Sequence, residues 1–297
     1  MTRLAGEPLV VVTGGKGRLA HAVVPEFRRR GWAVAALGHD ELDVTKRDVV
    51  FEIVTTMRPD AVVNLAAWTD VEGCERDRLR ADAVNAEAVR HVAEAGLATG
   101  AHVCHVSSDY VFDGKRSRPY RESDAARPIS AYGRSKLAGE FEAGPDATVI
   151  RVGWLAGVFG RSLVRTILDQ ATDPSGVLRY VTDQVGSPTM TEHAARALVD
   201  LVTERRSGLF HVASEGEASC HELARFVLAA AGDQPDRVVP VVTTELAPAQ
   251  QAARPAYSVL DGSKLRRVGV GLPPWQDAVG ELVRRLCAER AHIVRAV

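Results

Sequence analysis

Three side chains near the middle of the chain have the types and spacing needed to protonate a carbonyl oxygen. Tyr132 and Lys136 lie four residues apart in a stretch that follows Pro128 and is typical of a helix, so both occupy one face. A nearby ammonium favours the phenolate, lowers the pKa of the tyrosine and makes it a better proton donor to a developing alkoxide. Ser108 ends an apolar run, where its hydroxyl can bind the same oxygen. Taken singly, these residues also fit a solvated helix face and a helix cap.

A glycine-rich loop supplies a second chemical signal. The segment VVVTGGKGRLA places Gly14, Gly15 and Gly17 directly after an apolar run, with the small Ala20 where a helix would pack on a sheet. Glycines let a backbone turn tightly against a pyrophosphate, which then sits at the positive end of the helix dipole. An isolated loop of this kind can be a plain turn. Its position between a predicted strand and a predicted helix indicates dinucleotide binding.

The second predicted strand favours NADPH over NADH. An NAD site usually has an acidic residue at the end of that strand, but Gly38 and His39 stand there and Asp40 comes late. Lys16 and Arg18 in the glycine loop can meet a 2'-phosphate. They can equally be solvated loop charges, so NADH stays the alternative.

The elements that would position these residues alternate between strand and helix. Apolar runs at 9–13, 32–37, 61–65, 102–107 and 148–152 are separated by amphipathic stretches at 18–30, 46–57 and 77–99, the second of which Thr45 can cap. This order predicts a Rossmann-type α/β fold with a doubly wound parallel sheet. We expect residues 1–150 and roughly 177–207 to form the cofactor domain. Roughly 151–176 and 208–297 are expected to form a smaller α/β lobe that binds substrate.

Composition excludes several other classes of protein. The 297 residues are 46% hydrophobic with a formal net charge of -1, which argues against disorder and against a general nucleic-acid binder. No apolar run approaches the roughly 20 residues of a membrane span, and no secretory signal is evident. The four cysteines and nine histidines show no metal-ligand spacing, and we interpret His102 and His105 as structural. We expect a cytoplasmic enzyme acting on a small molecule, without a metal.

Six longer motifs narrow the prediction. RPDAVVNLAAWTDVEGCE, VSSDYVFDG, YGRSKLAGE, RVGWLAG, VTDQVGSPT and ARPAYSVLD occur in that order between residues 58 and 261. With the glycine loop, the Ser, Tyr and Lys set resembles the extended short-chain dehydrogenases/reductases, and the six motifs resemble the dTDP-4-dehydrorhamnose reductase family over nearly the whole chain. The resemblance implies NADPH-dependent reduction of the C4 ketone of a dTDP-linked 6-deoxy-4-ketohexose, foremost dTDP-4-dehydro-L-rhamnose to dTDP-L-rhamnose. A monomer or a homodimer is expected.

The resemblance also implies residue roles. Tyr132 would be the general acid, Lys136 its electrostatic partner and ribose anchor, and Ser108, where the family usually has threonine, the third catalytic residue. The cofactor contacts would be Gly14, Gly15, Lys16, Gly17, Arg18, Leu19, Asp43, Val44, Ala66 and Ala67, together with Tyr132 and Lys136. Asp43 can instead cap the next helix. The substrate contacts would be Ser108, Tyr110, Trp154 and Arg254, of which Trp154 can instead be core and Arg254 a surface ion pair.

Departures from the family pattern keep other functions open. Gly153 replaces a small hydroxyl residue, Ala156 replaces an aromatic one, and Trp68 stands where tyrosine is common. The substrate can therefore be another activated deoxysugar of antibiotic biosynthesis. A dehydratase is disfavoured because Asp109 and Tyr110 follow Ser108, without the expected glutamate. A non-catalytic NADP-binding regulatory subunit is the second alternative. Gln184, Ser187 and Pro188 match a family signature near the substrate nucleotide, although they also suit a tight turn.

Overall fold

A six-stranded parallel sheet is the largest element of the computed structural model, which describes residues 6–173, 175–245 and 252–295. The strand order is β10-β5-β4-β3-β1-β2, and every neighbouring pair is parallel. The strands are β1 (Leu9–Thr13), β2 (Ala33–Leu37), β3 (Ala61–Asn64), β4 (His102–Ser108), β5 (Thr148–Val152) and β10 (Gly208–His211). β1, β3 and β5 are buried along their whole length, as expected of parallel strands covered on both faces.

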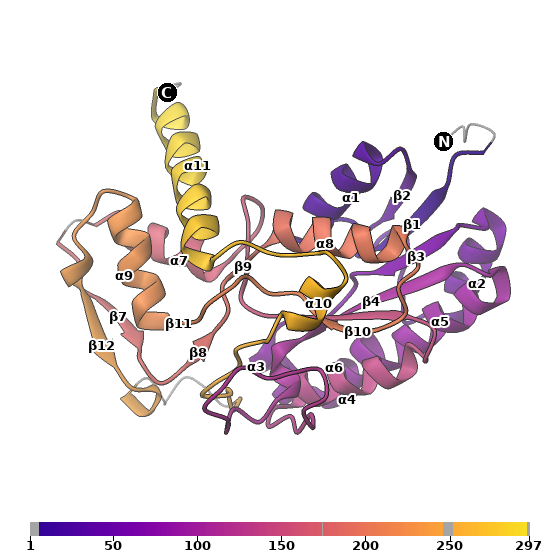
Figure 1. Ribbon diagram of the computed structural model, residues 1–297, viewed down its shortest axis with the longest axis horizontal. Coiled ribbons are helices and arrows are strands. Elements are labelled where there is room, and N and C mark those ends of the chain that lie inside the picture. The colour runs from indigo at the N-terminus through magenta and orange to yellow at the C-terminus, as the bar shows by residue number, and fades with distance from the viewer. Residues whose placement is uncertain (1–5, 174, 246–251, 296–297) are drawn as a thin grey trace.

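Helices cover the two faces of this sheet (Figure 1). One face carries α1 (Ala20–Arg29) and α8 (Thr191–Thr203), which share a hydrophobic cluster with Val10 and Val12. The other face carries α2 (Arg47–Met57), α5 (Ala88–Thr99) and α6 (Ala131–Glu142). The predicted doubly wound α/β fold is confirmed. The chain runs from β1 to β2 on one side and then to β3 on the other, so a crevice opens at the carboxyl ends of β1 and β3.

A second, smaller unit stands beside the sheet, at the left of Figure 1. Its hydrophobic cluster is formed by α7 (Leu163–Gln170), α9 (Cys220–Ala230), α11 (Trp275–Arg295) and the parallel pair β7 (Leu178–Val181) and β12 (Val238–Val241). α9 begins with a capping box, in which Ser219 and Glu222 are bonded reciprocally. Two short pairs connect the units: β6 (Leu155–Ala156) with β9 (Thr189–Met190), and β8 (Val185–Gly186) with β11 (Ala218–Ser219).

The remaining elements are short. They are α3 (Val71–Arg76), α4 (Arg78–Asp82), the π-helical η1 (Ala83–Glu87), α10 (Ser263–Arg267) and three 3-10 turns, η2 (Asp109–Val111), η3 (Pro235–Arg237) and η4 (Thr243–Glu245). The single helix expected over 77–99 is therefore interrupted by η1, which presents Asn85 to both backbone groups of Trp68. In the ranges that the structure describes, no helix is both long and apolar enough to traverse a membrane.

Three expectations about elements are corrected by the structure. Residues 178–181, assigned to the cofactor domain with the rest of 177–207, form β7 and pair with β12 in the smaller unit. Residues 208–211, assigned to the substrate lobe, form β10, because α8 returns the chain to the edge of the large sheet beside β5. Thr45 does not cap α2; its hydroxyl donates to Asp43, and Lys46 stands at the cap without a side-chain bond. The other domain boundaries stay a prediction.

Candidate active site

The glycine loop lies pressed between the ends of two strands. Gly14 has φ +61°, and a Cβ on it would lie 2.8 Å from the amide nitrogen of Ala66, after β3. A Cβ on Gly15 would lie 2.7 Å from the carbonyl carbon of Ala36 in β2. Only glycine fits these two positions without moving the backbone. Leu19 is buried, with α1 starting directly after it. The loop therefore has the close backbone approach that a pyrophosphate site needs.

The two cations of the loop point to different places. Lys16 lies over Gly38 at the end of β2, and its exposed amine is 3.1 Å from Asp40 Oδ2. Arg18 turns toward the smaller unit, where its guanidinium donates to the carbonyl of Leu155 at 2.7 Å. Its Nε is buried and has no hydrogen-bond partner in the described part of the chain. Of the two, Lys16 lies where a 2'-phosphate is expected.

The remaining residues predicted to contact cofactor divide into two pairs. Ala66 and Ala67 follow β3 beside the glycine loop, and Ala67 lines the central cavity. Asp43 Oδ1 accepts from the backbone N–H and the hydroxyl of Thr45, at 3.0 and 2.7 Å, and these bonds lower the pKa of Asp43. Val44 is buried. The Asp43 carboxylate thus organises a turn before α2.

Tyr132 and Lys136 come from the first two turns of α6, and tertiary contacts hold the start of this helix. Ser130 caps it by accepting from the Gly133 N–H at 3.1 Å, and Glu75 Oε1 accepts from the Ala131 N–H at 2.5 Å. A Cβ on Gly133 would lie 2.2 Å from the carbonyl oxygen of Tyr110 in η2. The helix can therefore approach η2 only because residue 133 is glycine.

The Tyr132 hydroxyl lies near Ser108, at the end of β4. Burial raises the pKa of Tyr132 to about 12, while the nearby Ser108 hydroxyl and the charge of Arg18 act in the opposite direction. This differs from the sequence-based expectation of a lowered pKa, because desolvation outweighs the cationic contribution. The ring of Tyr110 meets that of Tyr132 edge-on, with centroids 5.6 Å apart.

Lys136 is 2% exposed, and burial lowers its pKa to about 8, with Glu140 acting in the opposite direction. Its Nζ lies 3.4 Å from Nε2 of His105 on β4. We interpreted His105 as structural from the sequence alone, and its contact with Lys136 was missed. The odd spacing of His102 and His105 predicts opposite faces but does not reveal which helix lies above each face.

A buried carboxyl group stands behind Ser108. Ser108 Oγ donates to Asp109 Oδ1 at 3.0 Å, and Ser258 Oγ donates to Asp109 Oδ2 at 2.6 Å. Burial raises the pKa of Asp109 to about 6. Ser258, which lies inside the ARPAYSVLD motif, is not among the predicted site residues. Its signal was its place inside that motif, since residues 109 and 258 meet only through the fold.

Trp154 and Gly153 follow β5 at the entrance to the smaller unit. Trp154 has φ +45°, which is rare for a bulky residue and is typical of strained functional sites. A Cβ on Gly186 would lie 2.4 Å from its indole ring, so the glycine makes room for the ring. A Cβ on Gly153 would lie 3.0 Å from Asp109 Oδ2. Trp68, by contrast, packs under the guanidinium of Arg80 at 4.5 Å.

Arg254 fits both of its predicted interpretations. Its guanidinium lies 3.2 Å from Glu72 Oε1, and it also lines the central cavity. Gln184 of the DQVGSPT motif lines the same cavity, whereas Ser187 is buried and its hydroxyl accepts from the Leu260 N–H at 3.4 Å. The motif therefore contributes one residue of the cavity wall and one buried residue between β8 and β9.

One cavity of about 720 Å³ connects many of these groups and spans both units. From the large sheet it is lined by residues of the glycine loop and of the strand ends, including Gly17, Arg18, Ala67, Ser108, Asp109, Tyr110, Tyr132 and Lys136. From the smaller unit it is lined by Trp154, Ser162, Arg179, Tyr180, Gln184, Cys220 and Arg254. Of the latter, Ser162, Arg179, Tyr180 and Cys220 were not predicted. Among the described residues, no cluster of three or more His, Cys, Asp or Glu side chains could hold a metal ion.

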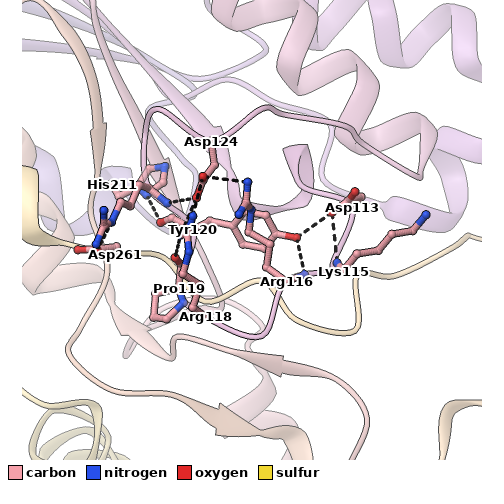
Figure 2. Close-up of polar contacts among 10 residues, drawn as sticks. Asp113, Lys115, Arg116, Arg118, Pro119, Tyr120, Asp124, His211 and Asp261 are labelled. Carbon is pink, nitrogen blue, oxygen red and sulfur yellow. Dashed lines mark hydrogen bonds and ion pairs between the residues drawn. The ribbon is translucent and has the colours of Figure 1, made fainter.

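The loop that connects Ser108 to α6 is anchored by Tyr120, as Figure 2 shows. Tyr120 Oη donates to Asp113 Oδ1 at 2.8 Å, and its carbonyl oxygen lies 3.0 Å from Nδ1 of His211 on β10. Arg118 forms two bonds to the carboxylate of Asp124, at 2.9 and 3.0 Å. This loop has no regular structure after η2, and these contacts order it between the two halves of the candidate catalytic set.

Comparison with known proteins agrees with this geometry. The family described as RmlD substrate binding domain matches residues 9–288. A dTDP-4-dehydrorhamnose reductase of Streptomyces griseus is 39% identical over 297 residues, covering 97% of each chain. A probable dTDP-4,6-dihydroxy-2-methyloxan-3-one 4-ketoreductase of Streptomyces antibioticus is 39% identical and covers 91% of this chain and 93% of its own. A crystal structure of dTDP-4-dehydrorhamnose reductase from Bacillus anthracis in complex with NADP superposes with a TM-score of 0.89 at 30% identity, covering 94% of this chain and 99% of that one.

Proposed function

Because the chain belongs to the dTDP-4-dehydrorhamnose reductase family, we propose that it catalyses NADPH-dependent reduction of the C4 ketone of a dTDP-linked 6-deoxy-4-ketohexose. The principal substrate proposed is dTDP-4-dehydro-L-rhamnose, and the product is dTDP-L-rhamnose. The observation that carries this proposal is the single cavity that joins the end of the glycine loop, Tyr132, Ser108 and Lys136, and the polar wall of the smaller unit.

The residues present fit a bound NADPH. Gly14 and Gly15 leave no room for a Cβ, and Arg18, which lines the cavity, has a buried Nε that is a donor without a partner in the described ranges. Gly14, Gly15, Gly17, Arg18, Leu19, Ala66 and Ala67 would hold the pyrophosphate and neighbouring parts, and Lys16 the 2'-phosphate. Asp43 and Val44 would border the adenine. When bound, NADPH supplies a hydride to the ketone carbon, and this chemistry belongs to the cofactor.

The chain's own contribution is to protonate and orient the ketone oxygen. Tyr132 donates its hydroxyl proton to this oxygen as negative charge develops there, and Ser108 donates a hydrogen bond to it. In the structure the Ser108 hydroxyl donates to Asp109, so it must rotate away from this carboxylate to donate to the ketone oxygen. Lys136, with its ammonium buried one helical turn beyond Tyr132, stabilises the phenolate that remains and anchors the cofactor ribose.

The smaller unit would recognise the nucleotide and the sugar. Arg254 has a planar charged fork that suits a diphosphate, and Trp154 and Tyr110 offer apolar faces to the sugar ring. Binding would require Arg254 to share its guanidinium with Glu72 or to leave it. We thus propose that the large sheet binds cofactor and that the smaller unit binds the dTDP group. All four cysteines are free, which suits a cytoplasmic enzyme, and we propose a monomer or homodimer.

A second candidate function is C4 reduction of another activated deoxysugar, as in antibiotic biosynthesis. The favouring observation is that a relative named as a probable dTDP-4,6-dihydroxy-2-methyloxan-3-one 4-ketoreductase is as similar to this chain, at 39% identity, as the dTDP-4-dehydrorhamnose reductase of Streptomyces griseus.

Turnover assays separate the candidates. The purified protein is mixed with NADPH and with dTDP-4-dehydro-L-rhamnose made in situ by the upstream dehydratase and epimerase, and the loss of NADPH absorbance is followed. Turnover to dTDP-L-rhamnose supports the principal proposal, and another C4 epimer or substrate supports the second. Tight NADPH binding without turnover of any 4-ketosugar nucleotide would instead indicate a regulatory subunit.

A further inference from the structure

A row of buried polar side chains crosses the large sheet and ends at Lys136. Thr13, Asn64 and His105 are register partners on β1, β3 and β4, so their side chains leave the sheet on the same face. Thr13 Oγ1 lies 2.6 Å from Asn64 Oδ1, and Asn64 Nδ2 lies 3.2 Å from His105 Nδ1. His105 Nε2 is 3.4 Å from Lys136 Nζ. The row thus connects the strand before the glycine loop to the amine beside Tyr132.

All four side chains of this row are buried, so each of them needs a hydrogen-bond partner. Thr13 and His105 are 0% exposed, Asn64 is 1% and Lys136 is 2%. A buried polar group without a partner destabilises the fold, so each member depends on its neighbours. Burial and the charge of Lys136 hold the pKa of His105 well below its ordinary value. The imidazole is therefore neutral, with one nitrogen that donates and one that accepts.

The other charged groups around Lys136 already have hydrogen-bond partners of their own. Glu140 faces it from the same helix, but this carboxylate accepts from Arg151 of β5 at 2.6 and 2.7 Å and from Ser107 of β4 at 2.5 Å. In η2, Asp109 is bonded to Ser108 and Ser258, and η1 contributes the uncharged Asn85. Among the described residues, the Lys136 amine is hydrogen-bonded to the side chain of His105.

We propose that His105 is a positioning residue that keeps the Lys136 nitrogen hydrogen-bonded in both of its charge states. With the Asn64 amide nitrogen toward His105 Nδ1, as in the structure, the proton on Nε2 can donate to Lys136 when its amine is uncharged. A half-turn of the Asn64 amide reverses the row: Nδ1–H donates to the amide oxygen, and Nε2 accepts from the ammonium. The Thr13 hydroxyl serves either orientation, because it can donate or accept.

The role follows from what the proposed reaction requires of Lys136, and it rests on that proposed function. Lys136 must remain in place while the proton of Tyr132 leaves and returns, since a misplacement of about 1 Å in a catalytic group can cost about 100-fold in rate. A long lysine side chain has many rotamers. A partner that could hydrogen-bond Lys136 in only one charge state would leave its amine free to move in the other.

Two substitutions of His105 test the proposal. His105→Phe keeps an aromatic ring but offers no hydrogen bond, whereas His105→Gln places an amide near the position of Nε2 and can present either its oxygen or its nitrogen. The matched control is His102→Phe, a buried histidine on the same strand whose Nε2 lies 2.7 Å from Thr148 Oγ1. We expect His105→Phe to lower kcat by about 10- to 100-fold. His105→Gln and His102→Phe are expected to stay near the wild type, whatever their melting temperatures.

A measurement on the protein without cofactor or substrate reads the contact directly. The chain has five lysines, so the ¹³Cε signal of Lys136 can be identified by its loss in Lys136→Met and followed against pH by NMR. We expect Lys136 to titrate near a pKa of about 8 in the wild type. His105→Phe removes a hydrogen bond from both charge states, but the charge-assisted bond of the ammonium is the stronger one, so the pKa of Lys136 falls by about one unit. The kcat of this variant then declines at lower pH than that of the wild type, since Lys136 loses its charge earlier.

The outcomes are distinguishable from those that bear on the proposed function. An unchanged Lys136 titration in His105→Phe would overturn the inference, whatever the activity. Equal losses of kcat in His105→Phe and His102→Phe, with no rescue by His105→Gln, would also overturn it, because they would indicate a structural effect of burial. A shifted titration in a protein that reduces no 4-ketosugar nucleotide would sustain the contact between His105 and Lys136 and refute the reductase assignment instead.

Discussion

At the scale of single residues, the candidate site depends on how burial changes the pKa values of its acidic groups. Tyr132 has its pKa raised to about 12, so it is protonated at neutral pH and can serve as a donor. Asp109, with a pKa raised to about 6, lies behind Ser108 and orients the hydroxyl that Tyr132 contacts. The sequence predicts the identities of Tyr132 and Ser108. It does not predict the direction of the Tyr132 shift, because desolvation depends on packing.

Tyr132→Phe tests the proton donor. The change removes one hydroxyl and keeps the ring that meets Tyr110 edge-on, so the fold and NADPH binding should be retained. We expect kcat to fall by about 100- to 10,000-fold, the usual contribution of a general acid. Steady-state kinetics and a fluorescence titration with NADPH measure the two effects. Tyr257→Phe, which removes a hydroxyl bonded to Glu217, is the control. Retained turnover in Tyr132→Phe would refute the assignment.

Lys16 and Arg18 allow the cofactor preference to be dissected. Lys16 lies at the end of β2, whereas Arg18 faces the shared cavity. Lys16→Ala should raise the KM for NADPH by about 5- to 20-fold through loss of one charge-assisted contact, and leave the KM for NADH nearly unchanged. Arg18→Ala should weaken both cofactors alike. Equal effects of Lys16→Ala on NADPH and NADH would contradict a 2'-phosphate contact.

At the scale of elements, α6 and η2 must pack closely for the candidate catalytic residues to meet. Ser130 caps α6, and the helix touches the Tyr110 carbonyl only because residue 133 is a glycine. The spacing of Tyr132 and Lys136 predicts this helix. The close approach to η2 is not predictable from spacing, because it depends on a loop that Tyr120 anchors to the edge strand.

Gly133→Ala tests this packing. A Cβ there would lie 2.2 Å from Tyr110 O, so α6 must shift away from η2 and carry Tyr132 from Ser108. We expect a loss of stability of about 1–3 kcal/mol from overpacking together with a loss of kcat of at least about tenfold. Gly96→Ala in α5, where a Cβ would lie 2.4 Å from Val103, is the matched control and should lose stability alone. Melting curves and kinetics separate the two; equal kcat in both variants would contradict the argument.

The alternation of strand and helix makes the large sheet predictable from sequence, whereas the smaller unit is less so. β1 to β5 are apolar runs separated by amphipathic helices, and the structure places all five strands in the large sheet. β7 is only four residues long, and its partner β12 lies more than fifty residues further on, so its sheet could not be assigned from local pattern. β10 is equally short, and its place beside β5 depends on the return path through α8.

At the scale of the whole molecule, the cavity is shared between two hydrophobic clusters. Its cofactor side is built from strand ends of the large sheet, and its other side from short strands and helix starts of the smaller unit. Arg179, Tyr180 and Cys220 escaped prediction because they reach the cavity only through the packing of β7 against α9. Ligands that enter from the two units should therefore stabilise different segments.

Hydrogen exchange tests this division. NADPH should slow exchange in residues 14–20 and 66–67, and a dTDP-sugar or dTDP should slow exchange in residues 178–184 and 220–223. At 100 times its Kd, each ligand should stabilise the fold by about 2.7 kcal/mol. Mass spectrometry of peptides from the complete protein measures the pattern. Protection of the same peptides by both ligands would contradict separate binding regions.

The central claim is hydride addition at C4 of a dTDP-linked sugar. The most direct test supplies NADPH that is deuterated at nicotinamide C4, together with dTDP-4-dehydro-L-rhamnose, and locates the label in the product by NMR. The account predicts one deuterium on C4 of dTDP-L-rhamnose. Tyr132→Phe should form only the small amount of labelled product that its residual turnover allows. Deuterium at any other carbon, or oxidation of NADPH without deuterium in the sugar, would contradict it.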